Sequence, residues 1–294
     1  MTTAQFKSAV NAIVDRSALQ QGRSFATLMV HVDVARDCEQ RVQLALALAA
    51  RFQSTLIGVA GLVLRPAFAA GGIVVYHEPT EQDDRTVRAR LDDIGRRFEA
   101  KGQHLKHVEW RAALELPYEL ISREARSADL IIVGTRHGGS GSVHDLVDPG
   151  AILLRAGRPI LVAPTTVGSP QLRRIVVAWK DTRECRRAVR DALPFLREAE
   201  HVLIVGIDEG QPDNAATLSD VAQYLRRHRV VAPREIWRRA RGPVGAELLH
   251  LVRNEGADLI VAGGYGRSRL GEWIFGGVTH ELLTSTPVCC FLSH

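Results

Sequence analysis

Ser127-Ala-Asp-Leu-Ile-Ile-Val-Gly134 recurs later in the chain as Gly256-Ala-Asp-Leu-Ile-Val-Ala-Gly263, at an offset of 263 − 134 = 129 residues. Two flanking segments also recur, Arg158–Ala163 as Thr286–Phe291 and Thr27–Asp33 as Arg174–Lys180. Several segments that recur in the same order are the signature of a duplicated structural unit. The sequence therefore predicts a tandem duplication.

The offset between the two copies shrinks along the chain. It is 174 − 27 = 147 residues at the first recurring segment and 129 at the quoted stretch, so the first copy carries 147 − 129 = 18 extra residues. We assign them to the segment from Gly61 to Glu81, which contains Pro66, Gly71-Gly72 and Pro79. Because glycine and proline favour turns, this segment is predicted to be a long loop or flap rather than a core element.

Within each copy, short apolar runs alternate with stretches of helical period. In the second copy the runs are Ile175–Trp179, Val202–Ile207, Val230–Trp237, Leu259–Ala262 and Val288–Leu292. Strands that are apolar throughout are typical of a parallel sheet covered by helices on both faces. We therefore predict an α/β protein with two tandem, doubly wound, five-stranded parallel-sheet domains, residues 23–166 and 172–294, preceded by a helical arm over residues 1–22.

Composition and length exclude several classes of protein. The 294 residues are 46% hydrophobic and 24% charged, which excludes a disordered or fibrous chain. The longest apolar stretches, such as Leu44–Ala50, are far shorter than the roughly 20 residues of a membrane span, and the first residues show no signal-peptide pattern, so a cytoplasmic protein is expected. The net charge of +5 comes with arginine clusters that have only Trp237 nearby as a stacking aromatic and no recognition motif, which argues against a nucleic-acid partner.

The loop after the fourth strand of the second copy has the spacing of a phosphate-binding loop. It runs from Gly263 through Gly266 to Gly276-Gly277, a G-x2-G-x9-G-G pattern. Ligands of doubly wound sheets bind at this end of the strands. Glycines let backbone N–H groups approach an anion closely, and a helix N-terminus attracts negative charge. These residues therefore outline a phosphate site.

The equivalent loop of the first copy ends differently. The repeat aligns Asp148 with Gly276, and Pro149 follows it. Asp followed by Pro is a strong signal for the N-cap and first position of a helix. The carboxylate of Asp148 would then occupy the anion site itself and repel a phosphate, so we expect no triphosphate there, although Asp33 keeps an acidic residue at the end of the first strand.

From about Phe25 to its end, the chain resembles the universal stress protein family in its tandem form. The resemblance implies the adenine nucleotide alpha hydrolase-like fold and phosphate contacts from a G-x2-G-x9-G-(S/T) loop. In this chain Gly277 replaces the final Ser/Thr, with Thr279 two residues on, and Lys180 stands where nucleotide-binding members have an acidic residue. The expected nucleotide-binding residues are Lys180, Gly263, Gly266, Arg267, Ser268, Gly276, Gly277 and Val278, with no catalytic or metal-binding residue.

The resemblance implies a stress-associated regulatory protein that binds ATP or a related adenine nucleotide in the second domain, with or without magnesium, and has no dedicated catalysis. An unidentified protein would be its partner. Two alternatives stay open. One is a nucleotide-independent scaffold in which the two domains form a pseudo-dimer, and two chains could also form a homodimer. The other is a slow ATP hydrolase.

The cysteines offer a further interpretation. Cys38 and Cys185 occupy equivalent helix starts, where a thiol of lowered pKa could sense oxidants. The simpler interpretation, which we favour, is that they are small helix-face residues kept through the duplication. Cys289 and Cys290 lie in an apolar run and are expected in the core.

Overall fold

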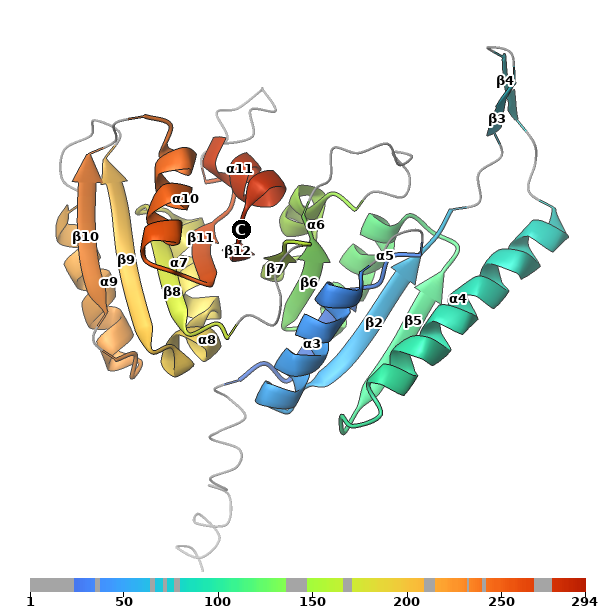
Figure 1. Ribbon diagram of the computed structural model, residues 1–294, viewed down its shortest axis with the longest axis horizontal. Helices are drawn as coiled ribbons and strands as arrows, with labels where there is room; N and C mark the ends of the chain where they lie inside the picture. Colours follow the sequence, from blue (N-terminus) through green and yellow to red (C-terminus); the bar gives the residue numbers. More distant parts are fainter. Residues whose placement is uncertain are drawn as a thin grey trace, which may run out of the picture.

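The computed structural model is an α/β structure built around one large sheet (Figure 1). The residues it describes are 24–34, 38–63, 67–70, 73–76, 80–135, 147–165, 171–208, 215–231, 233–239, 242–266 and 277–294. The predicted arm over residues 1–22 lies outside them. In the described part, no helix has both the length and the apolar character needed to cross a bilayer.

The main sheet has ten strands in the order β10-β9-β8-β11-β12-β7-β6-β1-β2-β5. All neighbouring strands are parallel except β12 and β7. The strands are β1 (Thr27–His31), β2 (Thr55–Gly61), β5 (Val108–Ala113), β6 (Leu130–Gly134), β7 (Ile160–Ala163), β8 (Arg174–Trp179), β9 (His201–Asp208), β10 (Arg234–Arg239), β11 (Leu259–Gly263) and β12 (Cys289–Ser293).

Each half of the chain contributes five strands in the same spatial order, which confirms the prediction of an α/β fold with a five-stranded parallel sheet in each copy. The halves meet where the last strand of each, β7 and β12, pair antiparallel with Leu161 opposite Phe291. The two predicted sheets are therefore continuous.

Helices cover both faces of the sheet, and each face has its own core. One core lies under α3, α4, α7, α8 and α9, and the other under α5, α6, α10 and α11. The helices are α3 (Glu39–Phe52), α4 (Glu81–Lys101), α5 (Pro117–Glu124), a 3-10 turn η1 (Ala125–Ser127), α6 (Pro149–Arg155), α7 (Arg183–Asp191), α8 (Leu193–Glu198), α9 (Ala215–Arg227), α10 (Val244–Asn254) and α11 (Gly277–Ser285).

The aspartate of the repeated Ala-Asp-Leu-Ile motif ties the first and fourth strands of each half together. Asp129 accepts hydrogen bonds from the backbone N–H groups of Ala26 and Thr27, at 2.8 and 2.9 Å, where β1 begins. Asp258 accepts the equivalent pair from Arg173 and Arg174 at the start of β8, both at 3.1 Å. Each half thus contains the same pair of hydrogen bonds between its fourth strand and the start of its first strand, which explains why the motif recurs.

Four phenylalanines form an aromatic cluster across the junction of the halves. Phe195 of α8 packs against Phe25 and Phe52 of the first half with ring centroids 5.2 and 5.3 Å apart, and against Phe291 of β12 at 6.0 Å. All four side chains are buried. Edge-on aromatic pairs of this kind add to the free energy gained from burial alone.

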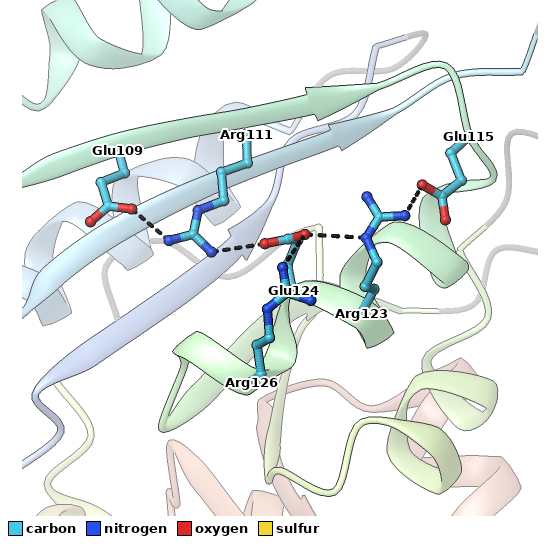
Figure 2. Close-up of polar contacts among 6 residues, drawn as sticks. All are labelled: Glu109, Arg111, Glu115, Arg123, Glu124 and Arg126. Carbon is cyan, nitrogen blue, oxygen red and sulfur yellow. Dashed lines mark hydrogen bonds and ion pairs between the residues drawn. The ribbon is translucent and has the colours of Figure 1, made fainter.

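The outer edge of the first half carries an ion-pair network, drawn in Figure 2, between β5 and the segment α5–η1. Its centre is Glu124, whose carboxylate lies 2.8 Å from a guanidinium nitrogen of Arg111 and 3.3 Å from nitrogens of Arg123 and Arg126. Burial alone would raise the pKa of Glu124, but hydrogen bonds from Arg111 and Arg123 outweigh burial and lower it. The network joins the edge strand to the helix beside it.

The insertion in the first copy forms a hairpin. Strands β3 (Ala67–Ala70) and β4 (Ile73–Tyr76) pair only with each other, antiparallel, and are not part of the main sheet. In Figure 1 they stand clear of the rest of the molecule. This agrees with a flap rather than an added core element.

Candidate functional site

A cleft of about 200 Å³ opens at the carboxyl ends of β8 and β11. These strands are neighbours at the point where the chain order of the sheet reverses, since β9 lies on one side of β8 and β11 on the other. Open α/β sheets bind ligands in such crevices. Apolar side chains of β9 and α10, among them Val205 and Leu248, line its walls, and glycines line its rim.

Five of the eight predicted site residues line this cleft: Lys180, Gly263, Gly266, Gly277 and Val278. The other three, Arg267, Ser268 and Gly276, lie outside the described residues. The structure therefore brings together residues that are up to 98 positions apart in sequence (278 − 180). Their role in binding stays a prediction.

Gly263 has a packing role that does not depend on any ligand. A Cβ atom at this position would lie 2.5 Å from the backbone nitrogen of Cys185 and 2.8 Å from the carbonyl carbon of Glu184. Distances below 3.0 Å force the backbone to move. Glycine is therefore required here because the end of β11 touches the first turn of α7.

Gly277 is different, because the space beside it is open. Apart from its chain neighbours and the backbone of its own helix, no atom of the described residues lies within 4 Å of the position that a Cβ would take there. Thr279, which also lines the cleft, is buried, and its hydroxyl accepts a hydrogen bond from the backbone N–H of Tyr265 at 3.3 Å. Thr279 therefore anchors the segment at the end of β11, Gly263–Gly266, which we call the glycine loop.

The glycine loop also contacts the first half of the molecule. Tyr265 adopts a left-handed backbone conformation, with φ of 55°, and its hydroxyl lies against Gly150 at the start of α6. The side chain of Leu153, also on α6, lies against Gly264. A ligand at the loop would therefore be close to the surface that the halves share.

A carboxylate adjoins the cleft at a position that the sequence analysis did not single out. Glu184 Oε2 lies 3.0 Å from the position of a Cβ at Gly266, and the Glu184 side chain is only 5% exposed. Burial alone would raise the pKa of Glu184, but hydrogen bonds from Arg183, its own backbone and Thr182 outweigh burial and lower it. The sequence signal was an acidic residue in the first turn after β8.

Thr182 fixes the start of α7. It is the N-cap residue, and its hydroxyl accepts a hydrogen bond from the backbone N–H of Cys185 at 3.3 Å. Capping of this kind stabilises a helix by about 1 kcal/mol. Because Thr182 also lines the cleft, the cap holds one wall of the site in place.

In the first half, Asp148 caps α6 as the sequence predicted. Its carboxylate accepts a hydrogen bond from the backbone N–H of Gly150 at 3.0 Å, and Pro149 occupies the first helical position. The N-terminus of α6 is thus already occupied by a negative charge.

Arg41, from α3, fills the crevice of the first half at the ends of β1 and β6. Its guanidinium donates to the carbonyl oxygen of His31 at 2.9 Å, pairs with Asp33 at 3.4 Å, and lies where a side chain at Gly134 would be. Burial and the nearby Arg41 hold the pKa of His31 well below its usual value, so this ring is neutral. The sequence analysis missed Arg41, although the repeat aligns it with Ala188 (41 + 147).

The cysteines fit the core interpretation better than that of an oxidant sensor. Burial raises the pKa of Cys185 to about 11 and that of Cys290 to about 12, and it also raises the pKa of Cys289. Thiols with such values stay protonated at neutral pH and are poor nucleophiles. Cys38 is half-buried.

The comparisons with known proteins agree with this architecture. Residues 171–292 match the model of the universal stress protein family. A universal stress protein from Archaeoglobus fulgidus has the same fold with a TM-score of 0.66 at 15% identity, over 91% of this chain and 95% of that one. A protein of unknown function from Pseudomonas aeruginosa has a TM-score of 0.56 at 15% identity, over 94% of each chain. No curated protein matches the chain. Residues 171–292 therefore form a domain of the universal stress protein family, and both halves of the chain have the fold of a known universal stress protein.

Proposed function

We propose that the second half binds one adenine nucleotide, ATP or a relative, in the cleft between β8 and β11, and that the chain is a stress-associated regulatory protein without dedicated catalysis. One observation carries the proposal: a glycine rim, a lysine and an apolar wall converge on one cleft at the reversal point of the sheet. Sites for small ligands combine an apolar wall with a few polar groups in this way.

Each part of the cleft has a role in the proposal. The apolar wall formed by Val205, Leu248 and Val278 takes the base. Lys180 and the backbone N–H groups near Gly266 and Gly277 take the phosphate. The bound nucleotide then contacts the loop that Tyr265 seats on α6, so that binding in the second half alters a surface of the first. A ligand shifts the equilibrium between two conformations only when its affinities for them differ. The two conformations would differ in this loop.

The first half favours a second role, that of a scaffold. Arg41 fills its crevice and Asp148 caps its anion site, so it keeps the fold without needing a ligand. We propose that this half supports the ligand-binding half and presents a surface to a protein partner.

The experiment is a calorimetric titration of the purified chain with AMP, and separately with ATP and magnesium. Two variants at one position isolate the electrostatic argument. Gly277→Asp places a carboxylate in open space at the first residue of α11 and should weaken binding by at least about tenfold. Gly277→Ala adds a similar backbone constraint without charge and should bind almost as the wild type does.

Equal weakening by both variants would show that the charge is irrelevant to the site. Absence of heat with either nucleotide, together with an unchanged melting temperature at millimolar ligand, would contradict the proposal and leave the scaffold alone. Phosphate release above background that Gly277→Asp abolishes would show an ATP hydrolase instead.

A further inference from the structure

A buried negative charge lies next to the predicted phosphate end of the cleft. Glu184 Oε2 is 3.0 Å from the Cβ position of Gly266, and the hydroxyl of Thr182 is 3.3 Å from the same point. Gly266 and Thr182 both line the cleft. A ligand phosphate that contacted the backbone at Gly266 would therefore be close to the Glu184 carboxylate.

This carboxylate is fixed in place. Its side chain is 5% exposed, and it lies in the first turn of α7, where Thr182 and its own backbone N–H donate hydrogen bonds to it. The pKa of Glu184 is lowered, so the group is ionised at neutral pH. A charge with little contact to water interacts strongly with a second charge nearby.

Among the described residues, the positive charges beside Glu184 are much more exposed. Arg183 forms an ion pair with Glu184, but its side chain is 69% exposed, and Lys180 is also exposed. Water screens such groups more effectively than a buried carboxylate. Asp181, the other acidic residue in this turn, pairs with Arg186 at 2.6 Å. Each additional ligand phosphate would therefore meet repulsion that these cations do not fully offset.

We propose that Glu184 determines specificity in the second-half cleft, which takes adenosine monophosphate in preference to adenosine triphosphate. The inference rests on the proposed function and deepens it. Glu184 does not react with the ligand. It adjoins the phosphate end of the cleft and disfavours ligands that carry more negative charge there.

The test compares the affinities of AMP and ATP for the full chain, measured by calorimetry without divalent metal. The wild type should bind AMP at least about tenfold more tightly than ATP. Glu184→Gln keeps the size of the side chain and removes its charge. The ratio of the affinity for AMP to the affinity for ATP should therefore fall by about tenfold. Arg183→Gln removes the exposed counter-ion and should enlarge the preference. Glu200→Gln, at the opposite end of the strands, should leave it unchanged.

The outcomes separate the inference from the function on which it rests. An AMP-to-ATP ratio that is the same in the wild type, Glu184→Gln and Arg183→Gln would overturn the inference while nucleotide binding stands. Tight ATP binding that requires magnesium and is lost in Glu184→Gln would also overturn it, because Glu184 would then serve as a metal ligand. Failure of both nucleotides to bind any of these chains would overturn the proposed function itself.

Discussion

Single side chains account for the difference between the two equivalent crevices. In the first half, the long Arg41 side chain reaches across the ends of β1 and β6 and pairs with Asp33. In the second half the aligned residue is Ala188, which leaves the cleft open, and Glu184 adjoins it instead. The duplication has kept the fold, while a few substitutions have given the halves different crevices.

Gly263 and Gly277 belong to the same motif but respond differently to substitution. Gly263→Ala should lower the free energy of unfolding by about 1–3 kcal/mol, because its new methyl group would overlap the backbone of α7. Gly277→Ala, where the described neighbours leave open space, should lower it by less than about 1 kcal/mol.

Urea denaturation of both variants measures these differences. Equal stability of Gly263→Ala and the wild type would show that β11 and α7 are not in close contact. The comparison also separates packing from binding, since of these two glycines Gly263 alone has no room for a side chain.

At the scale of elements, carboxylates hold neighbouring strands and helices together by binding backbone N–H groups or by forming ion pairs. Asp129 and Asp258 bind the first strands, Asp148 caps α6, and Glu124 joins α5 and η1 to the edge strand β5. A buried carboxylate with several partners is costly to leave unpaired. The stability that Glu124 contributes therefore depends on pH.

Glu124→Gln should lower the free energy of unfolding by about 1–3 kcal/mol at pH 7, because three arginines lose their ionised partner. The folded pKa of Glu124 lies below its unfolded value, so its contribution is complete above about pH 4.3 and is lost as the pH falls through the folded pKa.

Denaturation of the wild type and the variant between pH 7 and pH 3 measures this difference. The difference in the free energy of unfolding between the two proteins should become smaller as the pH falls. Glu99→Gln, on the exposed face of α4, should show no gap at any pH. A Glu124→Gln gap that is constant down to pH 3 would contradict the electrostatic account.

At the scale of the molecule, the contacts that unite the halves include the antiparallel pairing of β7 with β12 and the phenylalanine cluster beside it. Figure 1 shows α8, which carries Phe195, on the side of the second half that faces α3. The two halves thereby share one continuous core as well as one sheet.

Phe195→Ala should lower the free energy of unfolding by about 3–5 kcal/mol, since it removes a fully buried ring that contacts three others. Leu154→Ala, at a side chain that is 44% exposed, should cost less than about 1 kcal/mol. Calorimetric melting of both variants tests this. Similar effects from the two substitutions would show that the cluster does not join the halves.

The sequence predicted the features that depend on local or repeated signals. The duplicated Ala-Asp-Leu-Ile motif indicated the paired strands, and Asp148-Pro149 indicated the capped helix. Contacts between distant segments could not be predicted from the sequence. Arg41 meets Gly134 only after α3 packs on β6, and Glu184 meets Gly266 only after α7 packs on β11. Neither pairing has a signature in the spacing of residues along the chain.

We propose that the second half alone forms an adenine-nucleotide site. Equilibrium dialysis of the full chain against radiolabelled AMP, and against ATP with magnesium, counts the sites directly. We expect saturation at one nucleotide per chain, because Arg41 and Asp148 fill the crevice of the first half. Saturation at two nucleotides per chain, or no binding at millimolar ligand, would contradict it.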